Sequence, residues 1–187
     1  MSLKDLINDN TTDKNTVHSY LDTYEELFES KKHENINVLE IGIHYGGSIK
    51  LWRDYFTNAQ IYGVDVINES DGIIRENSIL VDPHIKLLTR VNAYDHSFIN
   101  FLKSKKFDIL IDDGPHTFDS VVFFVQYYLP LLNDGGVMVI EDIQHWDWID
   151  KLSDLVPNNL KDKIRVYDLR KNKNRYDDIL FVVDLRK

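Results

Sequence analysis

The sequence contains no cysteine, and other features that define protein classes are missing from it as well. Without cysteine, a disulfide framework and a thiolate metal site are excluded. No apolar run approaches the roughly 20 residues that a membrane helix needs. The opening residues MSLKDLINDN are too polar for the core of a signal peptide. We therefore expect a cytoplasmic protein.

Positive charge is also scarce, because 22 lysines and arginines stand against 31 acidic residues and give a formal net charge of −9. Nucleic acids and anionic membranes bind basic surfaces, so we expect neither as a partner. Small molecules and metals remain as the favoured ligands. The chain also lacks internal repeats, low-complexity tracts and Gly/Ser/Pro linkers, and 187 residues with 43% hydrophobic content suffice for a single domain.

Apolar strand-like runs alternate with longer amphipathic segments along the chain. The predicted strands are 36–42, 60–66, 85–91, 107–112, 136–141, 164–169 and 178–185, and the predicted helices are 16–30, 47–56, 96–103, 117–132 and 143–155. This order predicts an α/β fold with a doubly wound, mainly parallel seven-stranded sheet. The last two strands are joined by RKNKNRYD, which is too short for a crossover helix, so we expect an antiparallel C-terminal edge hairpin.

The turn after the first strand carries the first functional signal. Gly42, Gly46 and Gly47 are spaced as G-x-x-x-G-G, which differs from the G-x-G-x-x-G of dinucleotide folds and disfavours a nicotinamide cofactor. Glu40 in the strand before this turn suits a cationic ligand, such as the amino group of S-adenosylmethionine. Asp65 closes the second strand, where a carboxylate can accept both hydroxyls of a ribose. Together they indicate a nucleoside cofactor; alternatively, the glycines only form a tight turn and Asp65 only caps the next segment.

Carboxylates also follow two later strands. Asp112 and Asp113 end the strand at 107–112, and Glu141 and Asp142 end the strand at 136–141. Neighbouring parallel strands bring their carboxyl ends to one edge, where open α/β sheets bind ligands. Carboxylates packed there repel each other unless a cation lies among them, and an oxygen-only set favours Mg²⁺, with Ca²⁺ or Mn²⁺ as alternatives. His116 is then placed to act as a general base.

Simpler interpretations of these segments stay open. Asp113 or Thr117 can cap the helix that follows, and His116 can make an ordinary polar contact. We interpret Trp146 and Trp148 in QHWDWI as core residues, with stacking on a sugar as the alternative. The helix beginning HTFDSVVFFVQYY is more apolar than a one-sided surface helix needs, which fits either a homo-oligomer contact or burial within the domain.

Five stretches together resemble one family. They are TDKNTVHSYLDTYEELF, VLEIGIHYGGSIKLWRDYF, IYGVDV, FDILIDDGPHTFDS and GGVMVIEDIQ, and they span positions 11 to 144. The chain resembles the class I S-adenosylmethionine-dependent methyltransferases, specifically the metal-dependent sugar O-methyltransferases of macrolide biosynthesis, of the mycinamicin and demethylmacrocin type. This resemblance implies a Rossmann-like methyltransferase domain over 1–187, with 1–33 as an N-terminal helical cover and 34–187 as the core.

The resemblance also implies roles for single residues. Asp113, Glu141 and Asp142 correspond to the metal ligands, and His116 corresponds to the base. The residues implied in cofactor binding are Thr12, Glu40, Gly42, Gly46, Gly47, Asp65, Asn92 and Asp112. Asn92 stands where the family usually has an acid, Ala93 replaces a glutamine, and Pro115 replaces a common serine, so the adenine contacts and the acceptor site depart from the family pattern.

The expected function is methyl transfer from S-adenosylmethionine to a hydroxyl of a sugar or another diol-bearing small molecule, with a divalent metal orienting the acceptor. Two alternatives stay open. A metal-independent methyltransferase of the same fold would use His116 or His145 as its base. A non-catalytic S-adenosylmethionine-binding or assembly module would bind the cofactor without forming a product.

Overall fold

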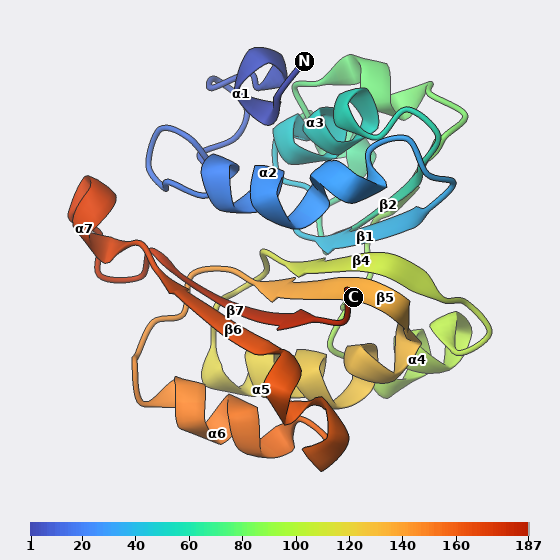
Figure 1. Cartoon of the computed structure of the whole chain (residues 1–187). Helices are drawn as coiled ribbons and strands as arrows, with labels where there is room; N and C mark the ends of the chain where they lie inside the picture. The colour runs from blue at the N-terminus through green and yellow to red at the C-terminus, as the bar shows by residue number, and fades with distance from the viewer. Residues whose placement is uncertain (187) are drawn as a thin grey trace. The chain divides into compact units, whose positions relative to one another are not determined.

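A computed structural model describes residues 1–186 of the chain, which form two compact units, 1–93 and 94–186. Each unit is an α/β arrangement with its own strands and its own buried residues (Figure 1). No helix within residues 1–186 is both long and apolar enough to cross a membrane. The single domain expected over 1–187 stays a prediction.

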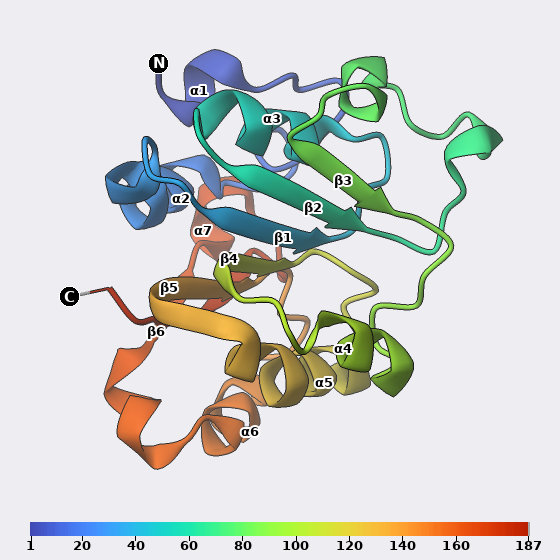
Figure 2. The ribbon, with the colours of Figure 1, turned by 90° about the vertical axis from the view of Figure 1, so that its right-hand side faces the viewer.

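The first unit has three parallel strands in the order β3-β2-β1. Its elements are α1 (Leu3–Leu6), α2 (Leu21–Phe28), η1 (Glu29–Lys31), β1 (Asn37–Ile41), α3 (Gly47–Tyr55), β2 (Gln60–Val64), η2 (Glu69–Asp71), η3 (Asn77–Leu80) and β3 (Ile85–Leu88). Figure 2 shows the three strands side by side, with α3 on one face. Aromatic residues with no exposed surface join α2 to α3, namely Tyr24, Phe28, Trp52 and Phe56.

The second unit has four strands in the order β4-β5-β7-β6. Its elements are α4 (His96–Leu102), β4 (Phe107–Asp112), α5 (Phe118–Tyr128), η4 (Leu129–Leu131), β5 (Leu132–Ile140), α6 (Trp148–Leu155), η5 (Asn158–Lys163), β6 (Ile164–Asp168), α7 (Arg170–Lys173) and β7 (Ile179–Asp184). β4 and β5 are parallel, while β7 is antiparallel to both β5 and β6. The predicted fold class, mainly parallel with an antiparallel C-terminal hairpin, is confirmed.

Three predicted helix boundaries were wrong. The helix expected at 16–30 begins only at Leu21, because the chain before it forms turns that end with Tyr20 N–H donating to the Lys14 carbonyl. The helix expected at 143–155 begins only at Trp148, because Ile143 N–H donates instead to the carbonyl of Ile179. The predicted helix at 117–132 stops at Tyr128, and a 3₁₀ turn follows it.

The strand expected at 136–141 begins four residues earlier, at Leu132. Its first part contains Asn133 and Gly135, residues typical of turns. The sheet accommodates them with a shift of register, since Leu132 pairs with Phe107 whereas Val137 pairs with Ile109. Gly135 has a φ of 74°, which only glycine adopts without strain. A bulge therefore replaces the predicted break between helix and strand.

Candidate active site

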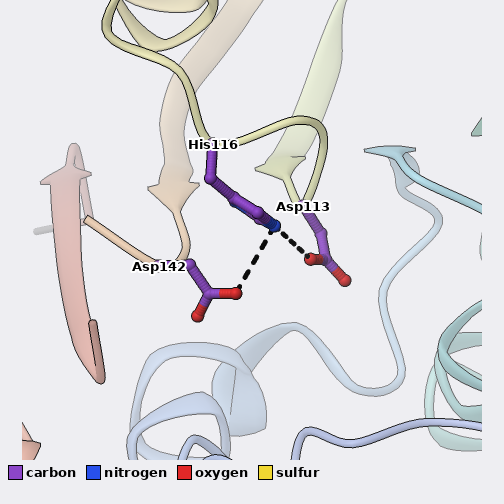
Figure 3. Close-up of side chains that lie close together, drawn as sticks. All are labelled: Asp113, His116 and Asp142. Carbon is purple, nitrogen blue, oxygen red and sulfur yellow. Dashed lines mark ion pairs between the residues drawn. The ribbon is translucent and has the colours of Figure 1, made fainter. Parts of the chain in front are cut away.

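The second unit brings three of the predicted site residues together. Asp113 follows β4, Asp142 lies two residues beyond β5, and His116 lies in the loop before α5 (Figure 3). His116 Nε2 is 3.6 Å from Asp113 Oδ1 and 3.4 Å from Asp142 Oδ2. One ligand atom from each residue lies within 4.8 Å of the others. The predicted metal and base residues thus converge at the carboxyl ends of two paired strands.

Glu141 lies beside this cluster. One of its carboxylate oxygens is within 4.8 Å of an Asp113 oxygen, and the residue is only 2% exposed. Its backbone N–H donates to the Asp112 carbonyl at 3.0 Å, which continues the β4–β5 pairing past the end of both strands. Three carboxylates and an imidazole therefore share this edge, an oxygen-rich donor set of the kind that binds hard divalent cations.

The backbone at the site is unusual. His116 and Asp142 have φ values of 52° and 53°, in the left-handed region that non-glycine residues rarely adopt. Such conformations persist when the surrounding structure fixes them, and they cluster at functional sites. Here they turn the two side chains toward Asp113 (Figure 3). The sequence pattern gave no signal for this conformation.

Of the two residues expected as candidates for the cap of α5, Asp113 and Thr117, the structure uses Thr117. Thr117 is the N-cap of α5, and its Oγ1 accepts from the backbone N–H of Ser120 at 3.2 Å. The Ser120 hydroxyl also contacts the Thr117 backbone N–H, at 3.1 Å, so the two residues satisfy each other's polar groups. The proposal that Asp113 serves as this cap is therefore wrong, and its carboxylate is directed to the cluster instead.

Asp112 is the buried member of the adjacent pair Asp112 and Asp113. Its side chain accepts from the Tyr94 hydroxyl and from the Gly114 N–H, the latter at 3.3 Å, both through Oδ1. Its Oδ2 is buried without a hydrogen-bond partner within residues 1–186. Burial raises the pKa of this carboxyl to about 7, although the Tyr94 hydroxyl opposes that rise. Tyr94 was not among the predicted site residues, because a tyrosine 18 positions earlier leaves no pattern in the sequence.

Gly114 is required by this arrangement. A Cβ there would lie 2.0 Å from the Tyr94 hydroxyl oxygen and 3.0 Å from Asp112 Oδ1. We expect Gly114→Ala to push Tyr94 away from Asp112 and to lower the free energy of unfolding by about 1–3 kcal/mol. Urea unfolding measures this change. The same substitution should cost less in a Tyr94→Phe background, where the clashing oxygen is gone; an equal cost in both backgrounds would contradict the assignment.

The predicted cofactor residues of the first unit lie at the ends of β1 and β2. Gly42 and Gly46 have positive φ values of 100° and 87°, and Gly46 is the N-cap of α3. A Cβ at Gly47 would lie 2.4 Å from the carbonyl oxygen of Thr11, so the N-terminal segment packs directly on this turn. Thr12, the next residue, is half-buried, and Asn92 is exposed after β3.

Asp65 holds the glycine turn in place. Its Oδ2 accepts from the backbone N–H groups of Ile43 at 2.7 Å and His44 at 3.1 Å, and its Oδ1 accepts from that of Ile67 at 3.1 Å. A carboxylate offers about four acceptor positions, so these three bonds leave capacity for a ligand hydroxyl. Asp65 therefore does more than cap the segment that follows it.

Glu40 has a cationic partner within the chain. It has no exposed surface, its Oε1 is 3.1 Å from Lys14 Nζ, and its Oε2 accepts from the indole N–H of Trp52 at 2.7 Å. Lys14 is equally buried. The sequence predicted a cationic ligand beside Glu40, the amino group of S-adenosylmethionine, whereas the cation found there is the ammonium of Lys14. The role of Glu40 in cofactor binding stays a prediction.

The interpretation of Trp146 as a core residue is wrong, because its side chain is 48% exposed. Trp148 is half-buried, with its ring centroid 5.2 Å from that of Phe118.

The apolar surface of α5 is covered partly within the unit, since Phe123 and Tyr127 contact the ring of His96. The expected homo-oligomer stays a prediction.

Comparison with known proteins defines the class of this protein. The family Methyltransf_24, a methyltransferase domain, matches residues 39–143, more than half of the chain. The chain belongs to this methyltransferase family, and the resemblance seen in the sequence is confirmed.

Particular relatives are sugar O-methyltransferases. The 8-demethyl-8-alpha-L-rhamnosyl tetracenomycin-C 2'-O-methyltransferase of Streptomyces olivaceus is 30% identical over 73% of this chain and 36% of its own length. Mycinamicin VI 2''-O-methyltransferase of Micromonospora griseorubida is 29% identical over 71% of this chain and 33% of its own length. The chain thus spans about a third of the length of these curated relatives.

Solved structures show the same fold. The MycE methyltransferase in complex with Mg, SAH and mycinamycin VI matches with a TM-score of 0.76 at 23% identity, over 100% of this chain and 54% of that chain. A likeness at this level of identity concerns the fold. The chain therefore has a Rossmann-like methyltransferase fold over its whole length.

Proposed function

We propose that this chain is an S-adenosylmethionine-dependent O-methyltransferase that acts on a hydroxyl of a sugar-containing small molecule, with a divalent metal at the acceptor site. The observation that carries the proposal is the convergence of Asp113, His116 and Asp142 within 4.8 Å at the carboxyl ends of β4 and β5. Family membership and the sugar O-methyltransferase relatives support the reaction class.

The donor set fits a hard divalent cation. Asp113, Glu141 and Asp142 supply carboxylate oxygens, with Mg²⁺ as the preferred ion and Ca²⁺ or Mn²⁺ as alternatives. Two of the three ligand positions are accessible, since the side chains of Asp113 and Asp142 are 26% and 11% exposed. A bound cation would supply positive charge that stabilises an acceptor oxygen as its proton leaves.

The cofactor residues fit a nucleoside ligand. Asp65 retains acceptor capacity for a ribose hydroxyl, and the buried Oδ2 of Asp112 has no hydrogen-bond partner within residues 1–186. Gly42 and Gly46 let the backbone turn sharply before the N-terminus of α3. S-adenosylmethionine supplies the methyl group of the reaction.

His116 takes the proton in this mechanism. The acceptor oxygen attacks the methyl carbon, the C–O bond forms as the C–S bond breaks, and the hydroxyl proton passes to His116 Nε2. Asp113 and Asp142 flank this nitrogen, so they orient the imidazole toward the edge where the acceptor would bind. The products are a methyl ether and S-adenosylhomocysteine. Positioning and electrostatic stabilisation supply most of the rate enhancement.

One experiment tests the function and separates the alternatives. S-adenosylmethionine is titrated calorimetrically into the full chain with and without Mg²⁺, and S-adenosylhomocysteine formation is measured with methyl α-L-rhamnoside and related glycosides. We expect cofactor binding, and turnover that a chelator abolishes. His116→Ala should lower turnover about 10²- to 10⁴-fold, whereas His145→Ala, the matched control, should leave it unchanged.

The other outcomes distinguish the rival functions. Turnover that withstands the chelator would indicate a metal-independent methyltransferase, and a loss on His145→Ala would move the base to that residue. Cofactor binding without product from any acceptor would favour the non-catalytic module. A chain that does not bind S-adenosylmethionine would contradict all three.

A further inference from the structure

The connection between β2 and β3 folds back over the glycine turn of the first unit. It contains η2 and η3, and residues 74–79 of this connection lie against the turn at Gly46. The backbone N–H groups of Arg75 and Glu76 both donate to the Tyr45 carbonyl, at 2.9 and 3.1 Å. A segment about 30 positions later in the chain therefore shares backbone hydrogen bonds with the turn that is predicted to hold the cofactor.

Side-chain packing holds the same two segments together. A Cβ at Gly46 would lie 2.6 Å from Ile79 Cδ1, so the connection leaves no room for a side chain on the turn. The guanidinium carbon of Arg75 lies 3.6 Å from the centroid of the Tyr45 ring, which is a cation–π contact. Backbone bonds, apolar contact and the cation–π contact together fix residues 74–79 on the turn.

Glu76 extends these contacts to the N-terminal segment. Its Oε1 accepts from the Asn8 side-chain amide at 2.7 Å and from the Thr11 hydroxyl at 2.9 Å. Thr11 also packs on the turn, because a Cβ at Gly47 would lie 2.4 Å from its carbonyl oxygen. One carboxylate oxygen therefore joins the N-terminal segment to the β2–β3 connection, and both segments lie against the glycine turn.

These contacts lie beside the groups predicted to bind S-adenosylmethionine. Asp65 accepts from backbone N–H groups in the first half of the turn, whereas residues 74–79 bind its second half. Thr12, which is implied in cofactor binding, directly follows Thr11. The contacts of Glu76 therefore influence both the turn and the segment that carries Thr12.

We propose that Glu76 is a positioning residue for S-adenosylmethionine, because its carboxylate holds the N-terminal segment on the glycine turn in the conformation that binds the cofactor. The inference rests on the proposed function, since it concerns the cofactor of that reaction. Glu76 acts through Asn8 and Thr11 rather than on the reacting atoms. When only a fraction of the molecules has the competent conformation, ligand affinity falls by that fraction, and saturating ligand restores the competent state.

Cofactor titration and steady-state kinetics of Glu76→Ala test the proposal. We expect Kd and KM for S-adenosylmethionine to rise about tenfold, and kcat at saturating cofactor to stay within about twofold of the wild type. A merely structural role would lower kcat through loss of folded enzyme and leave KM unchanged. That result, or an unchanged Kd, would overturn the proposal.

Glutamine at the same position separates hydrogen bonding from charge. Both donors bind a single oxygen, so Glu76→Gln can retain both bonds while it removes the negative charge. We expect its Kd to stay within about threefold of the wild type. We also expect Glu76→Ala to weaken S-adenosylhomocysteine, which has no sulfonium charge, as much as S-adenosylmethionine. If Glu76→Gln lost as much affinity as Glu76→Ala, or if only the sulfonium ligand were affected, attraction by charge would replace positioning.

Thr11→Val tests the same contact from the other side. It removes the hydroxyl that donates to Glu76 and changes the side-chain volume little. We expect it to weaken S-adenosylmethionine binding about threefold in the wild-type chain and by less in the Glu76→Ala background, because the two residues act through one hydrogen bond. Equal losses in the two backgrounds would show that Glu76 does not act through Thr11, and would overturn the proposal.

Glu69→Ala is the matched control for the loss of charge. Glu69 is exposed in η2 of the same connection, and its carboxylate accepts from the Thr89 hydroxyl at 3.4 Å. It should therefore leave the affinities for both ligands unchanged. A loss of affinity equal to that of Glu76→Ala would reduce the effect to net charge and contradict the positioning role.

The same titrations distinguish this inference from the proposed function. A wild-type chain that does not bind S-adenosylmethionine would contradict the methyltransferase function itself. Normal binding by the wild type, with the same affinity in Glu76→Ala, would contradict only the positioning role of Glu76.

Discussion

Replacing Asp113 by asparagine is expected to abolish Mg²⁺ binding and to lower methyl transfer about 10²- to 10³-fold, because the site loses both a ligand charge and its electrostatic stabilisation of the acceptor oxygen. Asp113 is the residue that joins the cluster, since its oxygens approach His116 as well as Glu141. Asparagine keeps the size of the side chain but removes the charge. Calorimetric Mg²⁺ titration and S-adenosylhomocysteine formation measure the two effects.

Asp119→Asn is the matched control for this substitution. Asp119 is exposed in the first turn of α5, six residues from Asp113, and it belongs to neither metal-ligand group. It should therefore leave both measurements unchanged. Unfolding curves of the two variants verify that each is folded. If folded Asp113→Asn bound Mg²⁺ like the wild type, the metal assignment at this edge would be wrong.

The elements of this fold were predictable wherever burial alone decides the structure. The strand at 107–112 was located to the residue, because three branched apolar residues at 109–111 run directly into the carboxylates of Asp112 and Asp113. The hairpin pairing followed from the length of its connection. The segments at 16–20 and 143–147 were not predictable from their amphipathic patterns, which fit a helix. The backbone at 16–20 instead forms local turns, and Ile143 N–H bonds to the distant carbonyl of Ile179.

The candidate site likewise has features that the sequence predicted and features that it did not. The approach of Asp113, His116 and Asp142 follows from strand order, and the sequence predicted it. The left-handed backbone conformations of His116 and Asp142 and the Tyr94–Asp112 contact depend on the tertiary structure and have no local sequence signature. The exposure of Trp146 was also missed, because an irregular segment before α6 takes the place of the predicted helix.

Replacing Lys14 by methionine is expected to lower the free energy of unfolding by about 3–5 kcal/mol, because it removes the ammonium that neutralises the buried Glu40. Lys14 and Glu40 have no exposed surface, so water cannot take over the role of the ammonium. Methionine preserves most of the side-chain length and apolar volume, which limits any cavity. Urea unfolding of the variant measures the loss.

The ion pair between Lys4 and Asp22 supplies the matched control, since these side chains are 55% and 81% exposed. Lys4→Met should therefore cost less than about 1 kcal/mol. The double variant Lys14→Met/Glu40→Gln should recover much of the lost stability, because a neutral amide needs no counterion and can still accept the bond from Trp52. A Lys14→Met variant no less stable than Lys4→Met would show that Glu40 does not depend on this ammonium. The predicted affinity of Glu40 for a cationic ligand would then lose its physical basis, since the same buried charge that requires Lys14 is the charge that would attract the amino group of the cofactor.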